Sequence, residues 1–437
     1  ICFIFPHIGF AGFPLIEFSL LNRTFVLPFL LIAVDQYINK KYYISFIILG
    51  LMYNLHVISV NFVLAMFFLD ILFRIKTIGV KKIIIMFLLF LLTALPVLVW
   101  KFAGEGLDFS VNRQWFDIVS KGFLFHLFNL FSSNLMLNTL TFSALSLIIL
   151  FVITIKKQKL TEINQIIIHF VLAASGVIMA VFFTSNLGIY PATIIIQSQI
   201  LRIGIFILLF AYLYCINDVV ISYQSKKIKT ISFIFLITAI LFFISPVMSL
   251  IAYLIHKYLS KKLTRIFIII NIIIFVISLI IGNIINVWQP GINIFYRKDK
   301  QTDVQIWILR NTPKDTVLIT PPYTWWFYNV EWRVLTERSN LVSLSDLLEV
   351  AFSPRHIKWW KPRFEDIAPG ALSQFKDNVF DNIMITKEAY YKLKTEDFLR
   401  IAKKYNASYL VVETAYKYNF SIVYKNEEFT VYKINPL

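Results

Sequence analysis

The chain has 437 residues, of which 58% are hydrophobic and 17% aromatic, and its mean hydropathy is +0.72. A soluble domain does not carry so much apolar surface, so this composition excludes an ordinary soluble protein. The net charge of +17 is uneven: 21 basic and 8 acidic residues precede Gly291, and 21 basic and 17 acidic residues lie from there onward. The excess therefore lies in the loops of an apolar region, which predicts membrane lipids rather than nucleic acid as partners.

Ten apolar segments before residue 288 predict membrane-spanning helices. A span needs about 20 apolar residues, or fewer where a tilted helix packs inside a bundle. The predicted spans are residues 24–37, 42–54, 57–73, 83–100, 139–155, 165–183, 199–219, 231–244, 246–258 and 266–287.

The loops that join these segments are alternately rich and poor in lysine and arginine. One set of loops holds 16 of the 21 basic residues, and the other set holds only Arg23, Lys101, Arg113, Lys121 and Arg202. Positive-inside bias assigns the rich loops to the cytoplasm. Because the chain is rich in Ile, Lys, Asn, Phe and Tyr, we predict a multi-pass protein of the cytoplasmic (inner) membrane of a prokaryote.

Residues 101–138 form a predicted outer loop, polar at its start and aromatic from Phe123 onward. The aromatic stretch is too short to span, which favours an interfacial or re-entrant helix. The chain also begins with Ile1 inside apolar sequence. We therefore expect a fragment or a processed start, with one or more membrane segments upstream.

Residues 288–437 have a different pattern, typical of a small α/β domain, whereas residues 1–287 form the transmembrane helical domain. Alternating spans place this second domain on the extracytoplasmic side. Strands are predicted at 316–320, 333–335, 409–412, 421–424 and 429–434, and helices at 303–310 and 395–406. A turn at Asn426 joins the last two strands as a hairpin.

Three patches of sequence carry a resemblance to a known superfamily. They are NRTFVLP (22–28) with GLMYNLH (50–56); QSQILR (197–202); and WILRNTPKD (307–315) with Pro321-Pro322, Glu337-Arg338 and WKPR (360–363). With the layout of helices, outer loop and C-terminal domain, they resemble a prokaryotic branch of the GT-C superfamily of membrane glycosyltransferases. The resemblance implies inverting transfer of a sugar from a polyprenyl-phosphate donor to an acceptor at the outer membrane face. It also implies a carboxylate in the first outer loop, which would precede Ile1.

Arg202 is the leading candidate for binding the donor phosphate. It stands alone as a charge at the outer end of an apolar segment, flanked by Gln197 and Gln199. A guanidinium presents a planar fork to phosphate oxygens. The alternative is an arginine that reaches to the lipid headgroups.

Two further groups lie on the same predicted face. Glu17 could act as a base or pair with Arg23 at a helix end. His56 could donate, accept or ligate near neutral pH, although a structural polar turn is the favoured interpretation.

The outer loop and the outer domain hold the remaining candidates. Glu105 and Asp108 could hold a divalent metal with a diphosphate, so a metal is a candidate cofactor. Trp325 and Trp326 could stack on an acceptor sugar or rest on the bilayer, and Arg338 extends the same region with Trp359, Trp360 and Arg363. His126 and His169 are isolated in apolar sequence, where we expect local partners.

Two other classes of function stay open. A transporter or flippase for a lipid-linked substrate would show internal repeats and buried ionisable residues. No clear repeat is present and the charges lie near the ends of the predicted spans, which favours the enzyme. A non-catalytic assembly or sensor protein is the third candidate. The sequence shows no GxGxxG, P-loop, HExxH or nucleophile elbow, which disfavours a soluble type of nucleotide-dependent enzyme.

Overall fold

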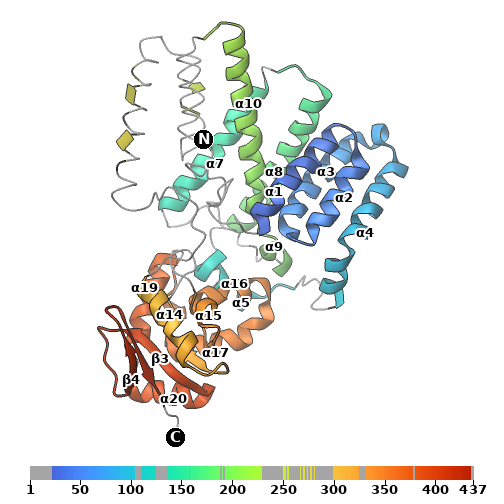
Figure 1. Cartoon of the computed structure of the whole chain (residues 1–437). Coiled ribbons are helices and arrows are strands. Elements are labelled where there is room, and N and C mark those ends of the chain that lie inside the picture. The colour runs from blue at the N-terminus through green and yellow to red at the C-terminus, as the bar shows by residue number, and fades with distance from the viewer. Residues whose placement is uncertain are drawn as a thin grey trace. The chain divides into compact units, whose positions relative to one another are not determined.

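The computed structural model describes most of the chain. The described residues are 22–103, 110–124, 135–156, 158–187, 189, 192–228, 299–323, 331–376 and 379–434, with scattered positions between 250 and 280. The chain divides into two compact units (Figure 1). The first contains Ile1–Val111 and His126–Gln289, and the second contains Asn112–Phe125 and Pro290–Leu437.

The first unit is helical throughout its described residues. Helix α2 packs against α1 and α4, α3 packs against α8, and α10 packs against α7 and α8. The elements are α1 (Asn22–Ile38), α2 (Tyr42–Tyr53), α3 (Val57–Ile78), α4 (Val80–Ala103), α7 (Leu135–Ile155), α8 (Glu162–Asn186), α9 (Thr193–Gln197), the 3₁₀ turn η3 (Ile200–Ile203) and α10 (Gly204–Gln224).

The expected count of about ten spans is not supported. Among the described residues, four segments are long and apolar enough to cross a membrane: Val57–Ile78, Val80–Ala103, Glu162–Val181 and Thr193–Gln224. Helix α2 has 12 residues, or about 18 Å, against a hydrocarbon core of about 30 Å. The predicted span 231–244 lies outside the described residues, as does most of 246–258 and of 266–287.

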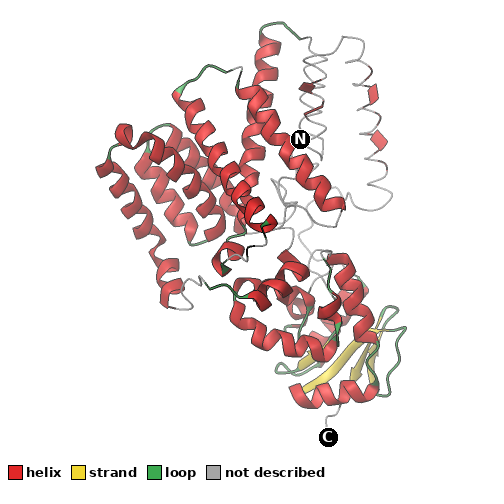
Figure 2. Cartoon of the chain, turned by 180° about the vertical axis from the view of Figure 1, so that it is seen from behind, coloured by secondary structure: helices red, strands yellow, loops and turns green. Residues whose placement is uncertain are grey.

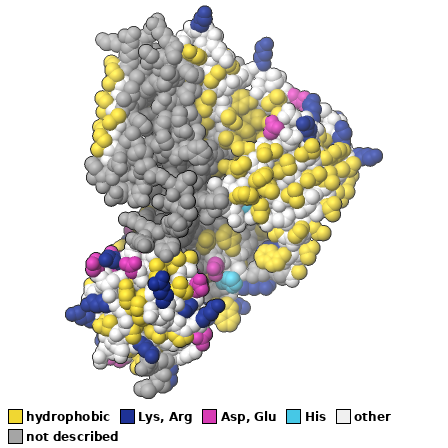
Figure 3. All heavy atoms as spheres, viewed as in Figure 1, with side chains coloured by type: hydrophobic (Ala, Val, Ile, Leu, Met, Phe, Trp, Pro, Cys, Tyr) yellow, Lys and Arg dark blue, Asp and Glu magenta, His cyan; other side chains and the backbone are white. Residues whose placement is uncertain are grey.

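Hydrophobic side chains cover the outer face of α2 and α4 (Figure 3). Leu88, Leu92 and Val99 of α4 are 58%, 67% and 56% exposed. An apolar patch of this extent is typical of a surface that faces lipid or another protein. The structure thus agrees with membrane character.

The close approach of α2 and α4 depends on Gly50 and Asn54. A Cβ at Gly50 would lie 2.6 Å from the Phe90 carbonyl oxygen, so only glycine allows this contact. Pro96 interrupts the backbone hydrogen bonds of α4, and Asn54 binds the backbone beside it. Asn54 Nδ2 donates to Thr93 O at 2.9 Å, and Asn54 Oδ1 accepts from Val97 N at 3.1 Å.

We expect Asn54→Ala to destabilise the protein by about 2 kcal/mol. The substitution leaves backbone groups of α4 without their partner, and each such buried group costs about 1–3 kcal/mol. Unfolding in detergent micelles measures the effect. Asn39→Ala is the matched control, since the side-chain hydrogen bonds of Asn39 within the described residues go to nearby Asp35 on an exposed turn. Equal losses in both variants would contradict the bridging role of Asn54.

The second unit contains a sheet and helices in two separate stretches of chain. The described elements are α5 (Arg113–Val119), the π-helix η2 (Ser120–Leu124), α14 (Lys300–Asn311), β1 (Val317–Ile319), α15 (Trp332–Thr336), β2 (Ser339–Asn340), η4 (Leu344–Asp346), α16 (Leu347–Phe352), η5 (Pro354–His356), α17 (Ile357–Ile367), α18 (Ala371–Gln374), α19 (Val379–Tyr391), α20 (Thr395–Tyr405), β3 (Ala407–Glu413), β4 (Ser421–Lys425) and β5 (Phe429–Lys433).

The five strands form one mixed sheet in the order β2-β1-β3-β5-β4 (Figure 2). Strand β1 pairs in parallel with β2 and β3, whereas β5 pairs antiparallel with β3 and β4. Successive side chains of a strand point to opposite faces, and Tyr409 and Val411 pack with Val304 and Ile308 of α14. Leu410 and Val412 are also fully buried, so both faces of β3 are covered.

Most of the predicted elements of this unit are confirmed. Strands β1, β3, β4 and β5 and helices α14 and α20 lie where the sequence predicts them. The strand predicted at 333–335 is wrong, because these residues lie in α15. Trp332 is fully buried in the core of α14 and the sheet, and Thr336 Oγ1 donates to Trp332 O at 2.6 Å, which completes a helical turn.

Part of the predicted interfacial loop belongs to the second unit. Trp115 of α5 is 1% exposed, and its Nε1 donates to Val350 O at 2.6 Å. Asn382 Nδ2 of α19 donates to Lys121 O at 3.0 Å. A Cβ at Gly122 would lie 2.2 Å from Leu347 Cδ2, so the chain fits closely here. Residues 112–124 are therefore built into the α/β unit, although the 164 residues of 126–289 separate the two parts of that unit along the chain.

Candidate functional sites

One end of the first unit gathers three basic side chains. Arg23 lies in the first turn of α1, His56 is the N-cap of α3, and Arg202 lies in η3. Helix α3 contacts both α1 and η3. We call these three residues the Arg–His cluster. The sequence predicted all three on one face of the membrane domain, and in the structure the charges of Arg202 and Arg23 act on His56.

His56 has both a structural role and an altered charge. Its Nδ1 accepts a hydrogen bond from Ser59 N at 3.2 Å, which caps α3 just before the first apolar span. Burial, then the positive charges of Arg202 and Arg23, lower the pKa of His56 to about 4. His56 is therefore neutral near pH 7. With Nδ1 acting as acceptor, the ring proton lies on Nε2, which leaves that atom as a donor.

Gln199 shapes the turn that carries Arg202. Its backbone is left-handed, with φ 46°, which costs a residue with a side chain about 1–2 kcal/mol. The side chain is 2% exposed, and its Oε1 has no hydrogen-bond partner among the described residues. Strain and an unsatisfied buried oxygen at one residue are features that concentrate at functional sites. Gln197 ends the short helix before this turn.

The depressed pKa of His56 predicts a loss of stability on acidification. The unfolded histidine binds a proton as the pH falls through 6.5, whereas the folded form does so only near 4, so the folded state weakens in that window. We expect the free energy of unfolding to fall by about 2 kcal/mol between about pH 7 and about pH 5. Thermal unfolding at matched ionic strength measures this change.

His56→Asn is the informative variant for this effect. Asparagine also caps helices well, so it keeps the acceptor for Ser59 N and removes the titrating ring. The variant should lose the acid-dependent part of its stability while remaining folded. A pH dependence identical to that of the wild type would assign the effect to other groups.

Buried ionic groups that the sequence did not single out lie elsewhere in the first unit. Asp70 is fully buried in α3, about 12 Å before the end of that helix. Its carboxylate lies 2.7 Å from Tyr37 Oη, 2.8 Å from His169 Nδ1 and 3.0 Å from Arg74 Nε. We call these residues the Asp70 network.

The network continues to the helix ends through Arg74. Its guanidinium also binds Glu162 at 2.9 Å, and Glu162 binds Lys40 at 2.7 Å. Helices α1, α3 and α8 are thereby joined through charged groups. His169 thus has an ionic partner 99 residues away rather than a local one. The only feature of the sequence that could have indicated this network is an acidic residue inside an apolar segment, with an arginine one helical turn later.

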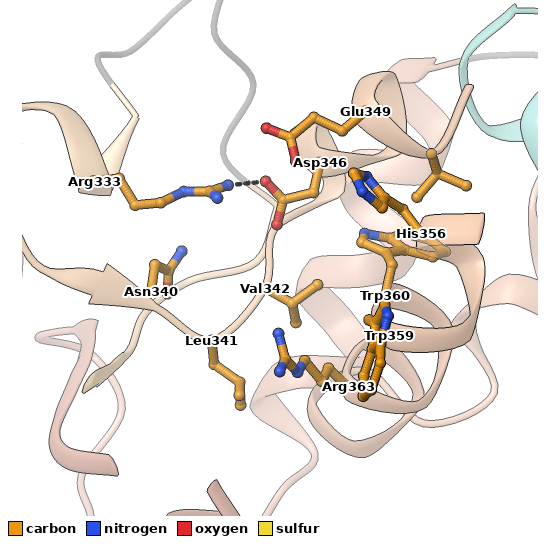
Figure 4. A pocket seen from close by; sticks show the side chains of 11 residues that line it. Arg333, Asn340, Leu341, Val342, Asp346, Glu349, His356, Trp359, Trp360 and Arg363 are labelled. Carbon is orange, nitrogen blue, oxygen red and sulfur yellow. Dashed lines mark ion pairs between the residues drawn. The ribbon is translucent and has the colours of Figure 1, made fainter. Parts of the chain in front are cut away.

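The second unit contains a cavity of about 290 Å³ between β2, α16 and α17 (Figure 4). Trp359 and Arg363, which the sequence pointed out, both line it, together with Trp360. Polar groups line the rest: Arg333, Asn340, Asp346, Glu349 and His356. Arg333 forms ion pairs with Asp346 and Glu331.

Arg338, by contrast, is built into the protein. It is 7% exposed, and its Nη2 donates to Leu309 O at 2.9 Å and to Thr312 O at 2.7 Å. These carbonyls end α14, so the guanidinium closes the C-terminus of that helix. Its predicted role in substrate binding stays a prediction. Glu17, Glu105, Asp108, Trp325 and Trp326 lie outside the described residues.

No group of three or more potential metal ligands occurs in the part of the chain that the structure describes. Comparison with known proteins adds no assignment: no protein family, curated protein or solved structure matches the chain.

Proposed function

We propose that the protein is a membrane glycosyltransferase that moves a sugar from a polyprenyl-phosphate donor to an acceptor at the extracytoplasmic face. The observation that carries the proposal is the Arg–His cluster, which gathers positive charge at the end of apolar helices. A lipid-linked sugar carries its phosphate at the membrane surface, where the lipid chain enters the bilayer. The resemblance to the GT-C superfamily supports the same reading.

The cluster suits a departing phosphate in charge and in hydrogen bonding. Breaking the bond between sugar and phosphate leaves negative charge on the phosphate oxygens, and a fixed cation stabilises that charge. Arg202 supplies a planar fork for two oxygens and Arg23 a second positive charge. The neutral ring of His56 adds an Nε2 donor without further repulsion between cations. A carboxylate in an outer loop would act as base, as the resemblance implies.

Transfer in a defined lipid system tests the proposal. The protein, reconstituted in liposomes with polyprenyl-phosphate glucose or polyprenyl-phosphate mannose, should release polyprenyl phosphate when acceptor glycolipids are present. Sugar nucleotides should not replace these donors. Absence of transfer and of donor hydrolysis with both lipids, in protein shown to be folded, would contradict the proposal.

The Asp70 network favours a transporter or flippase as the second candidate. Buried ionisable residues inside membrane helices mark substrate or proton paths in many transporters. Movement of a fluorescent polyprenyl-phosphate analogue between leaflets tests this reading. Asp70→Asn should slow the movement in a transporter and leave it unchanged in a glycosyltransferase.

A further inference from the structure

We infer that the cavity between β2, α16 and α17 is a carbohydrate-binding site for one or two neutral sugar rings. The inference rests on the second unit alone. Its extension, that the bound sugar is the acceptor of the reaction, rests on the proposed function. The volume of about 290 Å³ lies at the lower end of the range for small-ligand pockets.

The wall of the cavity supplies an aromatic platform. Trp359 is 67% exposed, although a tryptophan in a folded domain is usually well buried. Trp360 beside it is 5% exposed and fixed, since its Nε1 donates to Ser343 O at 3.0 Å and its ring stacks on Phe364. The two rings therefore differ in role: Trp360 anchors α17, and Trp359 presents an open ring. The C–H face of a pyranose fits the electron-rich face of such a ring.

Hydrogen-bond donors and hydrogen-bond acceptors both surround this aromatic platform. Asn340 Oδ1 accepts from Thr320 at 2.9 Å, whereas its buried Nδ2 has no partner among the described residues. Glu349 and His356 are exposed at the edge of the cavity and form no ion pair within the described chain. Arg363 lies over the ring of Tyr405, which holds its guanidinium in place. Sugar hydroxyls both donate and accept hydrogen bonds, and this mixed set of amide, carboxylate, imidazole and guanidinium serves both needs.

The charge balance of the cavity argues against an anionic ligand. Two arginines, Arg333 and Arg363, are matched by two carboxylates, Asp346 and Glu349. Arg333 is in addition neutralised by its ion pairs with Asp346 and Glu331. A phosphate or nucleotide would meet Glu349 at close range, and like charges repel. A polyhydroxylated neutral ring meets no such penalty.

Saturation-transfer NMR on the full chain tests the site. The protein is held in lipid nanodiscs, because maltoside detergents would themselves present sugar rings. The probes are methyl β-glucopyranoside, methyl α-mannopyranoside, methyl β-galactopyranoside and N-acetylglucosamine, with acyclic sorbitol as a comparison of equal polarity. We expect at least one pyranoside to bind with a Kd on the order of 1 mM, through its ring C–H groups, and sorbitol to give no signal.

Matched variants assign the binding to the cavity. Trp359→Ala should weaken binding at least tenfold, and Glu349→Gln should weaken it or change the preference among probes. Trp100→Ala, the same substitution at a side chain 73% exposed in the first unit, should leave the affinity within twofold. The proposal is overturned if no pyranoside exceeds sorbitol, or if both cavity variants bind as the wild type does. The NMR experiment contains no donor, so it tests sugar binding apart from transfer. If a sugar binds but the protein transfers nothing in the liposome assay, the carbohydrate site stands, and the acceptor role fails together with the proposed function.

Discussion

Replacing Asp70 by alanine is expected to destabilise the first unit by about 3–5 kcal/mol, the largest stability effect of any single substitution considered. The carboxylate accepts from Tyr37, His169 and Arg74, and its removal leaves Arg74, itself 8% exposed, without its nearest counter-charge. Breaking a buried ion pair from one side costs about this much, because the remaining buried charge keeps only its ion pair with the more exposed Glu162. Unfolding in micelles with increasing denaturing detergent measures the loss.

Three comparisons separate charge from packing in this result. Lys40→Ala removes an ion pair at a side chain that is 61% exposed, and such solvent-screened pairs contribute little to stability. Asp70→Asn keeps the shape and part of the hydrogen bonding, so its loss should be intermediate. The double variant Asp70→Leu with Arg74→Met should be more stable than Asp70→Ala, since replacing both partners removes the unpaired charge. If Asp70→Ala lost no more than Lys40→Ala, the network would have no role in stability.

The Asp70 network also shows where reading the sequence reaches its limit. Periodicity and the alternation of basic loops placed Arg23, His56 and Arg202 together, because each of these residues lies at a boundary between apolar and polar sequence. Asp70 and His169 lie inside apolar segments, 99 residues apart. Side-chain packing along both helices determines which faces of α3 and α8 meet. A local sequence pattern does not predict that packing.

In the second unit, too, some features could be predicted from local sequence and others could not. Strands β3, β4 and β5 are five to seven residues long and follow one another closely, so their prediction needed only local sequence. The helix α15 was mistaken for a strand because its five residues are too few to show a helical period. The cavity could be predicted only in part. The sequence pointed out Trp359 and Arg363 beside the aromatic region of the outer domain. Asn340 reaches the same space because β2 pairs in parallel with β1, and Asp346 follows shortly after that strand. A strand of two residues is too short for this pairing to be predicted from the sequence.

Replacing Arg202 by alanine is expected to lower transfer from the lipid-linked donor by about 100- to 1000-fold. Loss of one preplaced donor to a developing negative charge has an effect of this size. Arg202 lies in η3, between α9 and α10, on a turn held by the left-handed Gln199. The side chain is half-buried, so the substitution should leave the helices folded. Release of polyprenyl phosphate by the reconstituted protein measures the loss.

The conservative substitution tells a phosphate ligand from a membrane anchor. Arg202→Lys keeps the charge and the reach to lipid headgroups but lacks the planar fork, so it should recover only a minor part of the activity if Arg202 binds the phosphate. If Arg202 only anchors the helix at the headgroups, lysine should restore activity fully, because either cation serves there. Arg310→Ala is the matched control: it removes an exposed arginine from α14 and should keep wild-type activity. Wild-type transfer by Arg202→Ala would remove the Arg–His cluster from the donor site and leave the proposed function without the observation that carries it.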